Sequence, residues 1–400
     1  MSDAAHTYDA GRIQVIEGLE AIRKRPGMYV GSTTRRGLHQ LVFEALSPAV
    51  HGALTRGSGS VDVTLTSDGG VRVADDGPGV PFGSAGDAAP GLEARLTQVY
   101  AGWERGSARG VRLDLFGVGL CTVNALSSRL TAEVRRGGVR EIQEHARGVA
   151  LAPPTPAGPA TGSGTTLAFW PDADIFETTE CSYDVLADRL RELAFLNRGL
   201  RMSLTDERPP GGAVTERFEG GVRDFVAFLE SAADGTPVHS DILGFEVEDP
   251  RTAGTVEVAL RWRDSGDVVV EGFANSRRTH EGGAHVEGFH AGLAAAVTAY
   301  ARQRSLLTAA DADLDAERVG EGLTAVVSVK LDRPEFHGAT RALLAGAAVR
   351  SRVEEAVRDH VGTWLERHPE QASAVVDRIV GGAGRDRPAG QGRRYSPTGE

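Results

Sequence analysis

Alternating apolar and polar residues mark several short stretches of the chain, and this period of two predicts strands that bury one face. The alternation on both sides of the Asp-Gly-Gly turn at residues 68–70 predicts a β-hairpin over residues 61–75. The same pattern predicts a second hairpin over residues 129–145 and a strand over residues 165–171. Between these two, the Pro- and Gly-rich residues 153–164 predict a surface loop.

Apolar residues spaced three and four positions apart predict helices with one buried face. One of these helices contains Pro48, which lacks an N–H and crowds the preceding turn, so a bend is expected there. Residues 102–116 are rich in Gly and Arg without a clear period, which predicts a loop. The helices predicted for this half cover residues 13–23, 37–54, 91–101, 183–197 and a short stretch that opens after Gly119.

The second half of the chain repeats this mixture of strands and helices, which predicts a second α/β unit. The boundary is expected near residues 205–222, where the sequence is polar and rich in Gly and Pro. Residues 381–400 have a similar composition and predict a disordered tail. The predicted strands of this half are residues 254–262, 267–274 and 323–331, and the predicted helices are residues 286–303 and 340–367.

The composition, 40% hydrophobic and 25% charged over 400 residues, is that of an ordinary globular protein with room for two domains. The formal net charge of −11 argues against a protein whose main surface wraps nucleic acid. Cys121 and Cys181 supply neither a disulfide framework nor a metal quartet, which favours a reducing compartment. No stretch has the pattern of a signal peptide or a membrane span, so a cytoplasmic protein is expected.

Two carboxylates stand beside two glycines in the stretch DDGPGVP, which begins at Asp75 directly after a predicted strand. Glycine lets a ligand approach the backbone closely, and a carboxylate held there can accept a hydrogen bond from an exocyclic amine. Taken alone, the stretch has a simpler interpretation as an Asp-Gly turn.

Glycines also open a predicted helix in FGVGLCTVNAL, where backbone N–H groups and the helix dipole suit a phosphate. The stretch is neither a Walker A loop nor a G-x-G-x-x-G fingerprint, and an ordinary glycine loop is the alternative. Thr165 follows a glycine at a strand start, where its hydroxyl could meet a nucleotide or the residue could simply favour the strand.

Four such features follow one another along the chain: the lone acid Glu44 on an apolar helix face, D-x-G-x-G, G-x-G at a helix start, and G-T at a strand start. This ordered series resembles the ATP site of the GHKL superfamily of gyrases, heat-shock chaperones, histidine kinases and mismatch-repair proteins. Longer stretches are similar to the gyrase and topoisomerase IV B subunits, over about residues 8–380. These stretches read IQVIEGLEAIRKRPGMYVGST, GLHQLVFEA, VNALSSRL, FEGGVRDFVAFL, EGGAHVEGFHAGL and EGLTAVVSVKLDRPEF.

The resemblance implies an α/β (α+β) fold, with a GHKL Bergerat-type ATPase sandwich over residues 1–215 and a ribosomal-protein-like transducer domain over residues 216–380. The tail is then residues 381–400. ATP is the implied ligand. The implied assembly is a homodimer, or a heterodimer with a gyrase-type subunit, formed through an N-terminal arm that carries Tyr8 and Ile13. Contact with DNA is expected to be indirect at most, and no membrane contact is expected.

Roles for single residues also follow from the resemblance. Glu44 aligns with the general base that activates water against the γ-phosphate, a role worth about 10²–10⁴ in rate. Asp75 aligns with the acid that reads adenine, and Arg136 with an arginine at the mouth of the site. Arg341, in the loop FHGATRALL, aligns with a catalytic lysine of the transducer. The other implied nucleotide contacts are Gly77, Gly79, Gly117, Val118, Gly119, Thr165 and Tyr8.

Departures from the family pattern gather on the metal and triphosphate side. Pro48 replaces the Asn that holds Mg²⁺, and Ser47 replaces the preceding Asp, so no metal ligand is predicted and Mg²⁺ binding is in doubt. The lid reads LDLFGVG in place of G-G-L-H-G-V-G, and its Asp114 brings negative charge toward the phosphates. Further replacements are Glu104 near a lid lysine, Pro78 for an arginine, and Ala339-Thr340-Arg341 for Gln-Thr-Lys.

Three hypotheses stay open. Glu44, Thr165 and Arg341 favour an ATP-driven dimerising clamp with weakened hydrolysis. Pro48 and Asp114 favour a pseudo-ATPase that serves regulation, partner binding or inhibitor resistance. A new enzyme on the same scaffold, acting through His51, Asp114 or Glu44, is the third, because fold alone does not fix function. The sequence shows no D-x-D motif of the family's metal-binding module and no catalytic tyrosine subunit, so the chain is not expected to cleave DNA by itself.

Overall fold

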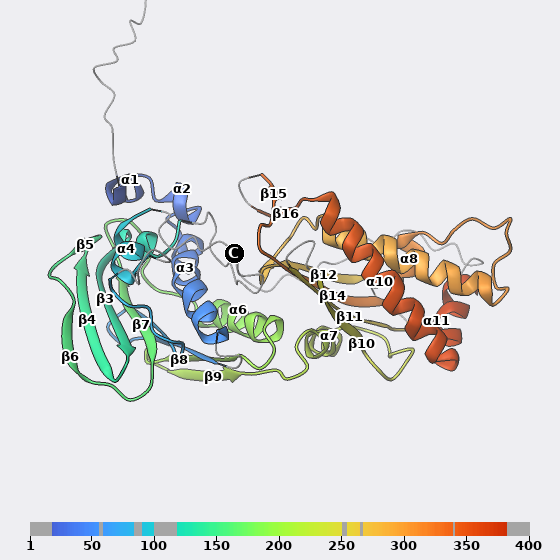
Figure 1. The fold of residues 1–400 in the computed structure, drawn as a ribbon, viewed down its shortest axis with the longest axis horizontal. Helices are drawn as coiled ribbons and strands as arrows, with labels where there is room; N and C mark the ends of the chain where they lie inside the picture. Colours follow the sequence, from blue (N-terminus) through green and yellow to red (C-terminus); the bar gives the residue numbers. More distant parts are fainter. Residues whose placement is uncertain are drawn as a thin grey trace, which may run out of the picture.

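The protein folds into two α/β units that lie side by side (Figure 1). No helix in the described part of the chain combines the length and the apolar character that crossing a bilayer requires. The structure, a computed structural model, describes residues 18–55, 59–83, 90–99, 118–249, 254–264, 267–338 and 341–381.

The first unit is built on a mostly antiparallel sheet. Its strands are β1 (Ser60–Leu65), β2 (Val71–Asp75), β3 (Ser127–Arg136), β4 (Val139–Ala146), β5 (Val149–Ala150), β6 (Thr155–Pro159), β7 (Gly164–Pro171), β8 (Arg201–Asp206) and β9 (Gly212–Glu216). Within the described residues they run in the order β5-β4-β3-β7-β2-β1-β8-β9, and β6 also pairs with β4. The pair β1 and β8 is parallel, and it joins segments far apart in the sequence.

Both predicted hairpins are confirmed. In the first, Val61 pairs with Asp75 and Leu65 with Val71, so the apolar residues of both strands face the same side. In the second, β3 and β4 pair antiparallel, as expected. The loop predicted over residues 153–164 is wrong in part, because β6 pairs with β4 despite its two prolines. Proline is tolerated there because an edge strand needs few of its own N–H groups.

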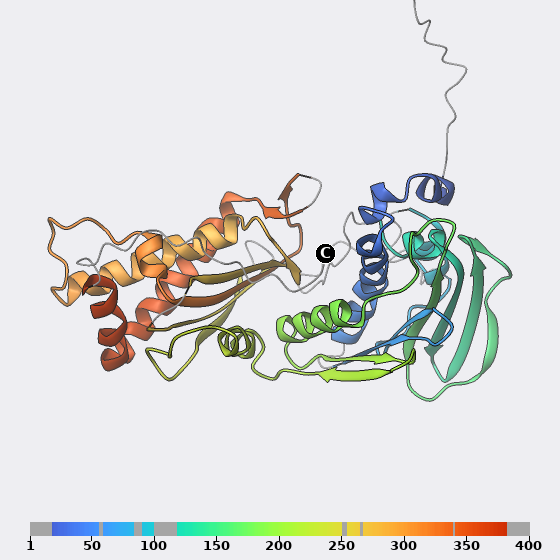
Figure 2. The same cartoon turned by 180° about the vertical axis from the view of Figure 1, so that it is seen from behind.

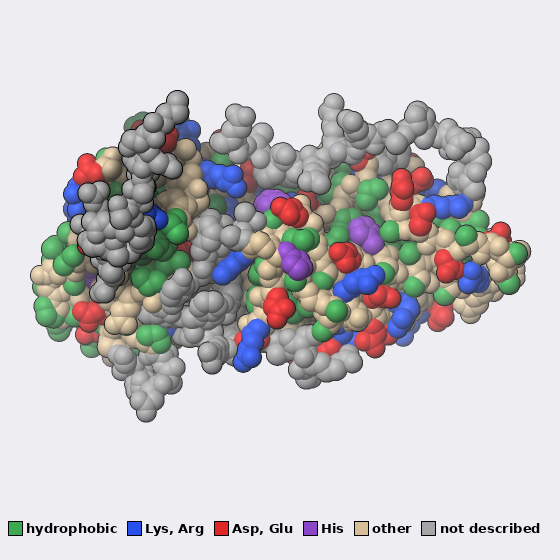
Figure 3. Space-filling model, turned by 90° about the horizontal axis from the view of Figure 1, so that it is seen from above, with side chains coloured by type: hydrophobic (Ala, Val, Ile, Leu, Met, Phe, Trp, Pro, Cys, Tyr) green, Lys and Arg blue, Asp and Glu red, His purple; other side chains and the backbone are tan. Residues whose placement is uncertain are grey.

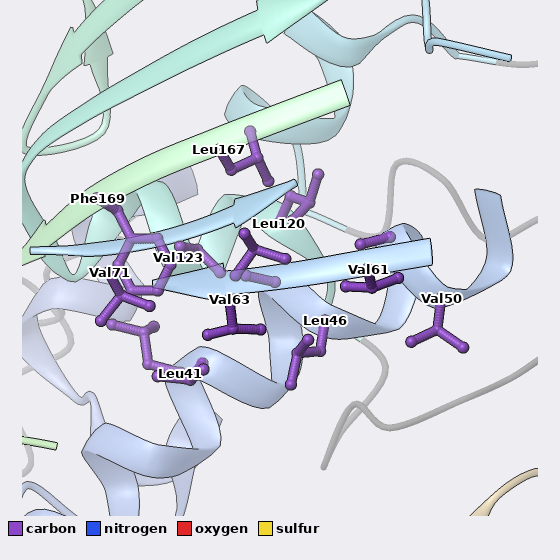
Figure 4. Close-up of a cluster of buried hydrophobic side chains, with 14 of the residues drawn as sticks. Leu41, Leu46, Val50, Val61, Val63, Val71, Leu120, Val123, Leu167 and Phe169 are labelled. Atoms are coloured by element: carbon purple, nitrogen blue, oxygen red, sulfur yellow. The ribbon is translucent and has the colours of Figure 1, made fainter. Parts of the chain in front are cut away.

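Helices cover one face of this sheet (Figures 1 and 2). They are α1 (Gly18–Lys24), α2 (Gly27–Val30), α3 (Arg35–Leu54), α4 (Leu92–Thr97), α5 (Leu120–Ala125) and α6 (Tyr183–Leu196). Apolar side chains of α3 and α5, such as Leu46 and Val123, meet Val63 of β1 and Phe169 of β7 in the core (Figure 4). The helix α3 continues through Pro48, while α4 ends earlier than predicted. The start of the predicted helix 13–23 lies outside the described residues.

The second unit has a sheet with helices on both faces (Figures 1 and 2). Its strands are β10 (Leu243–Asp249), β11 (Gly254–Trp262), β12 (Val269–Ala274), β13 (Arg277–Arg278) and β14 (Leu323–Leu331), and a separate hairpin consists of β15 (Phe336–His337) and β16 (Leu343–Leu344). Its helices are α7 (Val222–Ser231), α8 (Ala284–Gln303), α9 (Ala316–Gly320), α10 (Ala347–Arg367) and α11 (Pro369–Gly381). The sheet order is β10-β11-β14-β12-β13, with β12 and β14 parallel.

Sequence pattern located the main elements of this unit and missed others. The helix predicted over residues 340–367 begins later, at Ala347, because the residues before it form β16. The strands β8, β9 and β10 and the helix α11 were not predicted. The strand β9 belongs to the first sheet and ends at Glu216, beside the expected domain boundary, which itself stays a prediction.

Two histidines of the second unit are buried in their neutral form. The Trp262 N–H donates to His239 Nε2 at 3.3 Å, while Nδ1 lies 2.7 Å from the Asp241 carbonyl and donates to it. Burial lowers the pKa of His239 to about 4. It also lowers the pKa of His285, whose side chain is fully covered, to about 3.

Acid is therefore expected to destabilise the fold. A histidine in the unfolded chain has a pKa near 6.5, so between about pH 6.5 and pH 4 it binds a proton that His239 in the folded protein does not bind. The stability that depends on neutral His239 is complete above about pH 7 and is lost as the pH falls from about 6.5 toward 4, by about 2 kcal/mol at pH 5. Urea unfolding at pH 7.5 and pH 5 measures this loss. His239→Gln should lose less between the two, and the exposed His337→Gln should behave as wild type. An equal loss in His239→Gln would contradict the assignment.

Candidate functional site

Asp75 is the last residue of β2, and its carboxylate is buried against glycines. The Gly77 backbone N–H donates to Asp75 Oδ1 at 2.8 Å. A Cβ on Gly52 of α3 would lie 3.3 Å from the same oxygen, and a Cβ on Gly77 would lie 2.7 Å from it. The carboxylate fits at this position because Gly52 and Gly77 have no side chain. The turn thus fixes one carboxylate oxygen between β2 and α3.

The charge state of Asp75 suits hydrogen-bond acceptance near neutral pH. Burial raises the pKa of Asp75 to about 6, and the neighbouring carboxylate of Asp76 acts in the same direction. The backbone N–H groups of Gly77 and Thr165 and the charge of Arg135 offset part of this rise. At pH 7 about nine in ten of these carboxyl groups are therefore ionised.

The turn after Asp75 is tied to β7. The Val80 backbone N–H donates to Thr165 Oγ1 at 3.1 Å, and the Ser163 hydroxyl donates to the Gly77 carbonyl at 2.7 Å. Gly79 has a left-handed φ of 74°, and a Cβ there would lie 2.5 Å from the Arg135 carbonyl. The structure thus brings Asp75, Gly77, Gly79 and Thr165 together. Thr165 supports the turn whether or not a nucleotide is present.

Glu44 lies on α3, on the side of the helix that packs into the unit, and its side chain is buried. The Gln40 side-chain amide, one turn earlier, donates to Glu44 Oε1 at 3.2 Å. The charge of Glu44 also reaches α5. Burial raises the pKa of the Cys121 thiol to about 12, and repulsion from Glu44 is the second cause. The acid and the start of α5 therefore face a common region.

The glycine segment before α5 is described from Val118 onward. Gly119 has a φ of 90°, which favours glycine, and it directly precedes the first residue of the helix. Val118 is buried, and its carbonyl accepts a hydrogen bond from the Cys121 thiol at 3.4 Å. Gly117 and Tyr8, which the sequence also assigned to the nucleotide, lie outside the described residues, as do Asp114 and Glu104.

The metal side of this region offers few ligands. Pro48 follows Glu44 by one turn inside the continuous helix α3, and its side chain carries no oxygen. No cluster of three or more His, Cys, Asp or Glu suited to a metal occurs among the residues that the structure describes. Magnesium prefers several oxygen ligands in octahedral geometry. Pro48 therefore supplies no ligand for a Mg²⁺ one turn after Glu44.

Arg341 belongs to the second unit, in the hairpin of β15 and β16. This hairpin lies at the end of the second unit that faces the first (Figures 1 and 2). Arg341 has a left-handed φ of 53°, which is strained for a residue with a side chain. The backbone around it is anchored to the start of α8, because the Glu281 N–H donates to the Ala342 carbonyl and the Leu344 N–H to the Gly282 carbonyl. These bonds hold the described backbone that directly follows Arg341.

Sequence analysis missed two glycines that shape the site. A Cβ on Gly164 would lie only 2.0 Å from the Asp75 carbonyl, and Gly52 faces the Asp75 carboxylate. Arg135 also reaches over Gly164, since its Nη2 lies 3.5 Å from the Asp75 carbonyl. The isolated glycine at position 52 inside a helical pattern was a usable signal, because it suggests close backbone approach. Arg136, which was expected at the mouth of the site, donates to the Gly79 carbonyl at 3.1 Å.

Comparisons with known proteins agree with this architecture. A profile of the family described as DNA gyrase B matches residues 221–393. The DNA gyrase B protein of Streptomyces coelicolor is 42% identical over 393 residues, which cover 94% of this chain and 57% of that protein. The novobiocin-resistant DNA gyrase B protein of Streptomyces niveus is 42% identical over 391 residues, covering 94% of this chain and 58% of that protein. The chain thus spans somewhat more than half the length of these relatives.

Solved structures show the same relationship over nearly the whole chain. The 43K ATPase domain of Thermus thermophilus gyrase B, solved with an aminocoumarin, superposes with a TM-score of 0.78 at 29% identity, covering 91% of this chain and 94% of that chain. The topoisomerase IV ATP-binding domain of Francisella tularensis, solved with a small-molecule inhibitor, gives 0.74 at 26% identity, covering 92% and 97%. The predicted α/β fold of GHKL type is confirmed, and the chain is similar to DNA gyrase B proteins over nearly its whole length.

Proposed function

We propose that this protein is an ATP-binding, gyrase-B-like clamp of the type II DNA topoisomerase family, with weakened ATP hydrolysis. The observation that carries this proposal is the carboxylate of Asp75. One of its oxygens accepts the Gly77 N–H at 2.8 Å, and Gly52 and Gly77, which have no side chain, lie against it. An exocyclic adenine amine is the kind of donor that such a fixed carboxylate recognises. The similarity to ATPase-domain structures supports the same ligand.

The phosphate side of the proposed site uses the remaining residues. Val118 and Gly119 precede α5 and, with Gly117 and Tyr8, are proposed to contact the nucleotide. Glu44 is proposed as the general base that takes a proton from the attacking water. Arg341 is proposed to place its guanidinium near the γ-phosphate, where a cation stabilises the charge that develops during hydrolysis. The backbone bonds that join Ala342 and Leu344 to the residues before α8 support a fixed position for the backbone that follows Arg341.

The proposed ATP hydrolysis is weakened because the chain lacks the side chain that holds Mg²⁺ in the family. Nucleotide triphosphates are usually handled with a Mg²⁺ that bridges phosphate oxygens and neutralises their charge. Since Pro48 supplies no ligand and Ser47 replaces the preceding acid, we infer that the protein does not hold this metal through α3. Nucleotide binding should then depend little on Mg²⁺, and hydrolysis should be slow.

Pro48→Asn is expected to increase Mg²⁺-dependent ATP turnover severalfold, because it adds an amide oxygen one turn after Glu44. Pro48→Ala is the matched control. Both changes restore a backbone N–H inside α3 and should stabilise the helix, but only asparagine adds a ligand. Phosphate release, measured with Mg²⁺ and with EDTA, separates the two effects. Equal turnover in the two variants would show that the missing amide does not limit the reaction.

A pseudo-ATPase that acts in regulation, partner binding or inhibitor resistance is the second candidate. Pro48 favours it, because its side chain offers no ligand to a metal. Calorimetric titration with ATP and ADP, followed by phosphate release, decides between the candidates. Binding with slow turnover supports the clamp, and binding without turnover supports the pseudo-ATPase. If neither nucleotide binds, both are wrong.

The proposed partners also follow from the resemblance to gyrase B subunits. A homodimer, or a heterodimer with a gyrase-type subunit, would form through the N-terminal arm, and contact with DNA would be indirect. On the face drawn in Figure 3, acidic and basic side chains are interspersed over the described surface of the second unit. Together with the net charge of −11, this mixture gives no support to a broad DNA-binding surface there. Sedimentation with and without ATP would test the dimer. The cytoplasm remains the expected location.

A further inference from the structure

The two units meet at a junction between α6 and α7, which lie side by side (Figures 1 and 2). Phe195, near the end of α6, stacks on Phe225 of α7 with ring centroids 4.7 Å apart. Phe225 in turn lies 5.7 Å from Phe273 of β12, in the second sheet. All three rings are buried in one cluster. The junction therefore has a hydrophobic core of its own, shared by both units.

An ion network crosses the same junction. Arg278, on β13 of the second unit, donates from Nε at 3.0 Å and from Nη2 at 2.7 Å to Glu192 Oε1 on α6. Its third nitrogen pairs with Glu271 of β12. Glu192 also pairs with Arg189, whose Nη2 donates to the Ser276 carbonyl at 3.0 Å. The four charged side chains are only 12–14% exposed, so solvent screens them little.

Glu192 is the centre of this network, because it pairs with a guanidinium from each unit. Burial is the main cause that lowers the pKa of Arg189 to about 9, and the nearby charges of Arg278 and Arg277 act in the same direction. With Glu192 present, two arginines face two glutamates. If Glu192 lost its charge, the two arginines would keep Glu271 alone and would repel each other across the junction. If Arg278 were lost, Glu192 would still pair with Arg189.

We propose that Glu192 and Arg278 form a latch that fixes the second unit against the first. The aromatic cluster alone does not fix the relative orientation of the two units, because stacked rings resist separation but can slide over each other. A guanidinium that donates from two nitrogens to one carboxylate does fix the orientation of the two side chains. Its consequence is a single arrangement of the two units in solution in the absence of nucleotide. The proposal therefore stands or falls separately from the ATP site.

The test measures the distance between the units by double electron–electron resonance. Spin labels go on cysteines introduced at Glu144 of β4 and Glu366 of α10, which are exposed, while Cys121 and Cys181 are buried. The parent protein should give one narrow distance distribution. Glu192→Gln should broaden it at least twofold, and Arg278→Gln should broaden it less. Asp188→Asn is the matched control, because Asp188 pairs with Arg191 on the same helix and does not cross the junction.

Three results would overturn the latch: a broad distribution in the parent protein, an unchanged width in Glu192→Gln, or equal broadening in Asp188→Asn. Circular dichroism confirms that each variant is folded before its distances are read. Should Glu192→Gln fail to fold, Arg278→Lys replaces it, because lysine keeps the charge but cannot hold the carboxylate through two nitrogens. Arg278→Lys should then broaden the distribution by less than Arg278→Gln, and equal widths in the two would contradict the proposal.

Discussion

Asp75→Asn is expected to weaken ATP binding by about 10- to 100-fold, the loss that corresponds to one charge-assisted hydrogen bond of about 1.5–3 kcal/mol. The carboxylate has two acceptor oxygens, and one of them accepts the Gly77 N–H. An asparagine has a single oxygen, so either the Gly77 N–H or the adenine amine would then face an NH₂ group. Isothermal titration calorimetry at pH 7.5 measures the loss. Adenosine should show the same ratio as ATP, because the contact involves the base.

Asp76→Asn is the matched control for this change. Asp76 Oδ1 accepts the Ser60 backbone N–H at 2.8 Å, and an asparagine oxygen can still do so. Its affinity for ATP should therefore remain close to that of the wild type. Equal weakening in both variants would mean that the turn, and not the Asp75 carboxylate, decides binding.

The pH dependence gives a second measure of the same contact. The pKa of Asp75 is raised to about 6, so its acceptor form is lost as the pH falls below that value. Adenine affinity should thus fall about tenfold per pH unit below pH 6 and stay level above pH 7. Phosphates titrate in the same range, so the ratio of wild type to Asp75→Asn isolates the aspartate. This ratio should fall about tenfold between pH 7.5 and pH 5, and a constant ratio would contradict the assignment.

The elements that sequence alone predicted are those whose burial pattern is local. The hairpin 61–75 alternates cleanly because one face of each strand is buried, and α3 shows its apolar stripe despite Pro48. The strand β8 was missed although it pairs with the next strand, β9, and its burial alternates. Its other partner, β1, lies far away in the sequence, and that parallel pairing could not be predicted from a local pattern. The strand β6 was missed because prolines usually indicate a loop, and only its place at the sheet edge allows them.

Some features of the candidate site could likewise be predicted from the sequence, and others could not. The order of an acid, D-x-G-x-G, G-x-G and G-T predicted which residues gather, and contacts now join Asp75, Gly77 and Thr165 directly or through the turn. The role of Gly164 could not be predicted, because the Asp75 carbonyl that leaves no room for a side chain there comes from another element, whereas Gly52 left a signal that was not used. The junction network could not be predicted either, since Glu192 and Arg278 are far apart in the sequence and look like ordinary surface charges.

Glu44→Gln is expected to lower ATP turnover by about 10²–10⁴, while nucleotide affinity changes little. Glutamine keeps the shape of the side chain, and its oxygen can still accept the bond from Gln40 that Glu44 accepts at 3.2 Å, so the fold of α3 should persist. What is lost is the group that takes a proton from water. Removal of a buried acid should also raise the melting temperature by about 2–4 °C, because catalytic groups are often retained although they destabilise the fold.

This opposite movement of activity and stability separates a catalytic acid from a structural one. Gln40→Ala is the control, because it removes the partner of Glu44 and leaves the acid in place. It should reduce turnover only a few-fold, by loosening the orientation of the carboxylate. Phosphate release and thermal unfolding of the three proteins give both quantities. Unchanged turnover in Glu44→Gln would place the chemistry elsewhere. A large loss of stability would instead make Glu44 part of the packing of α3 against α5, where its charge already acts on the Cys121 thiol.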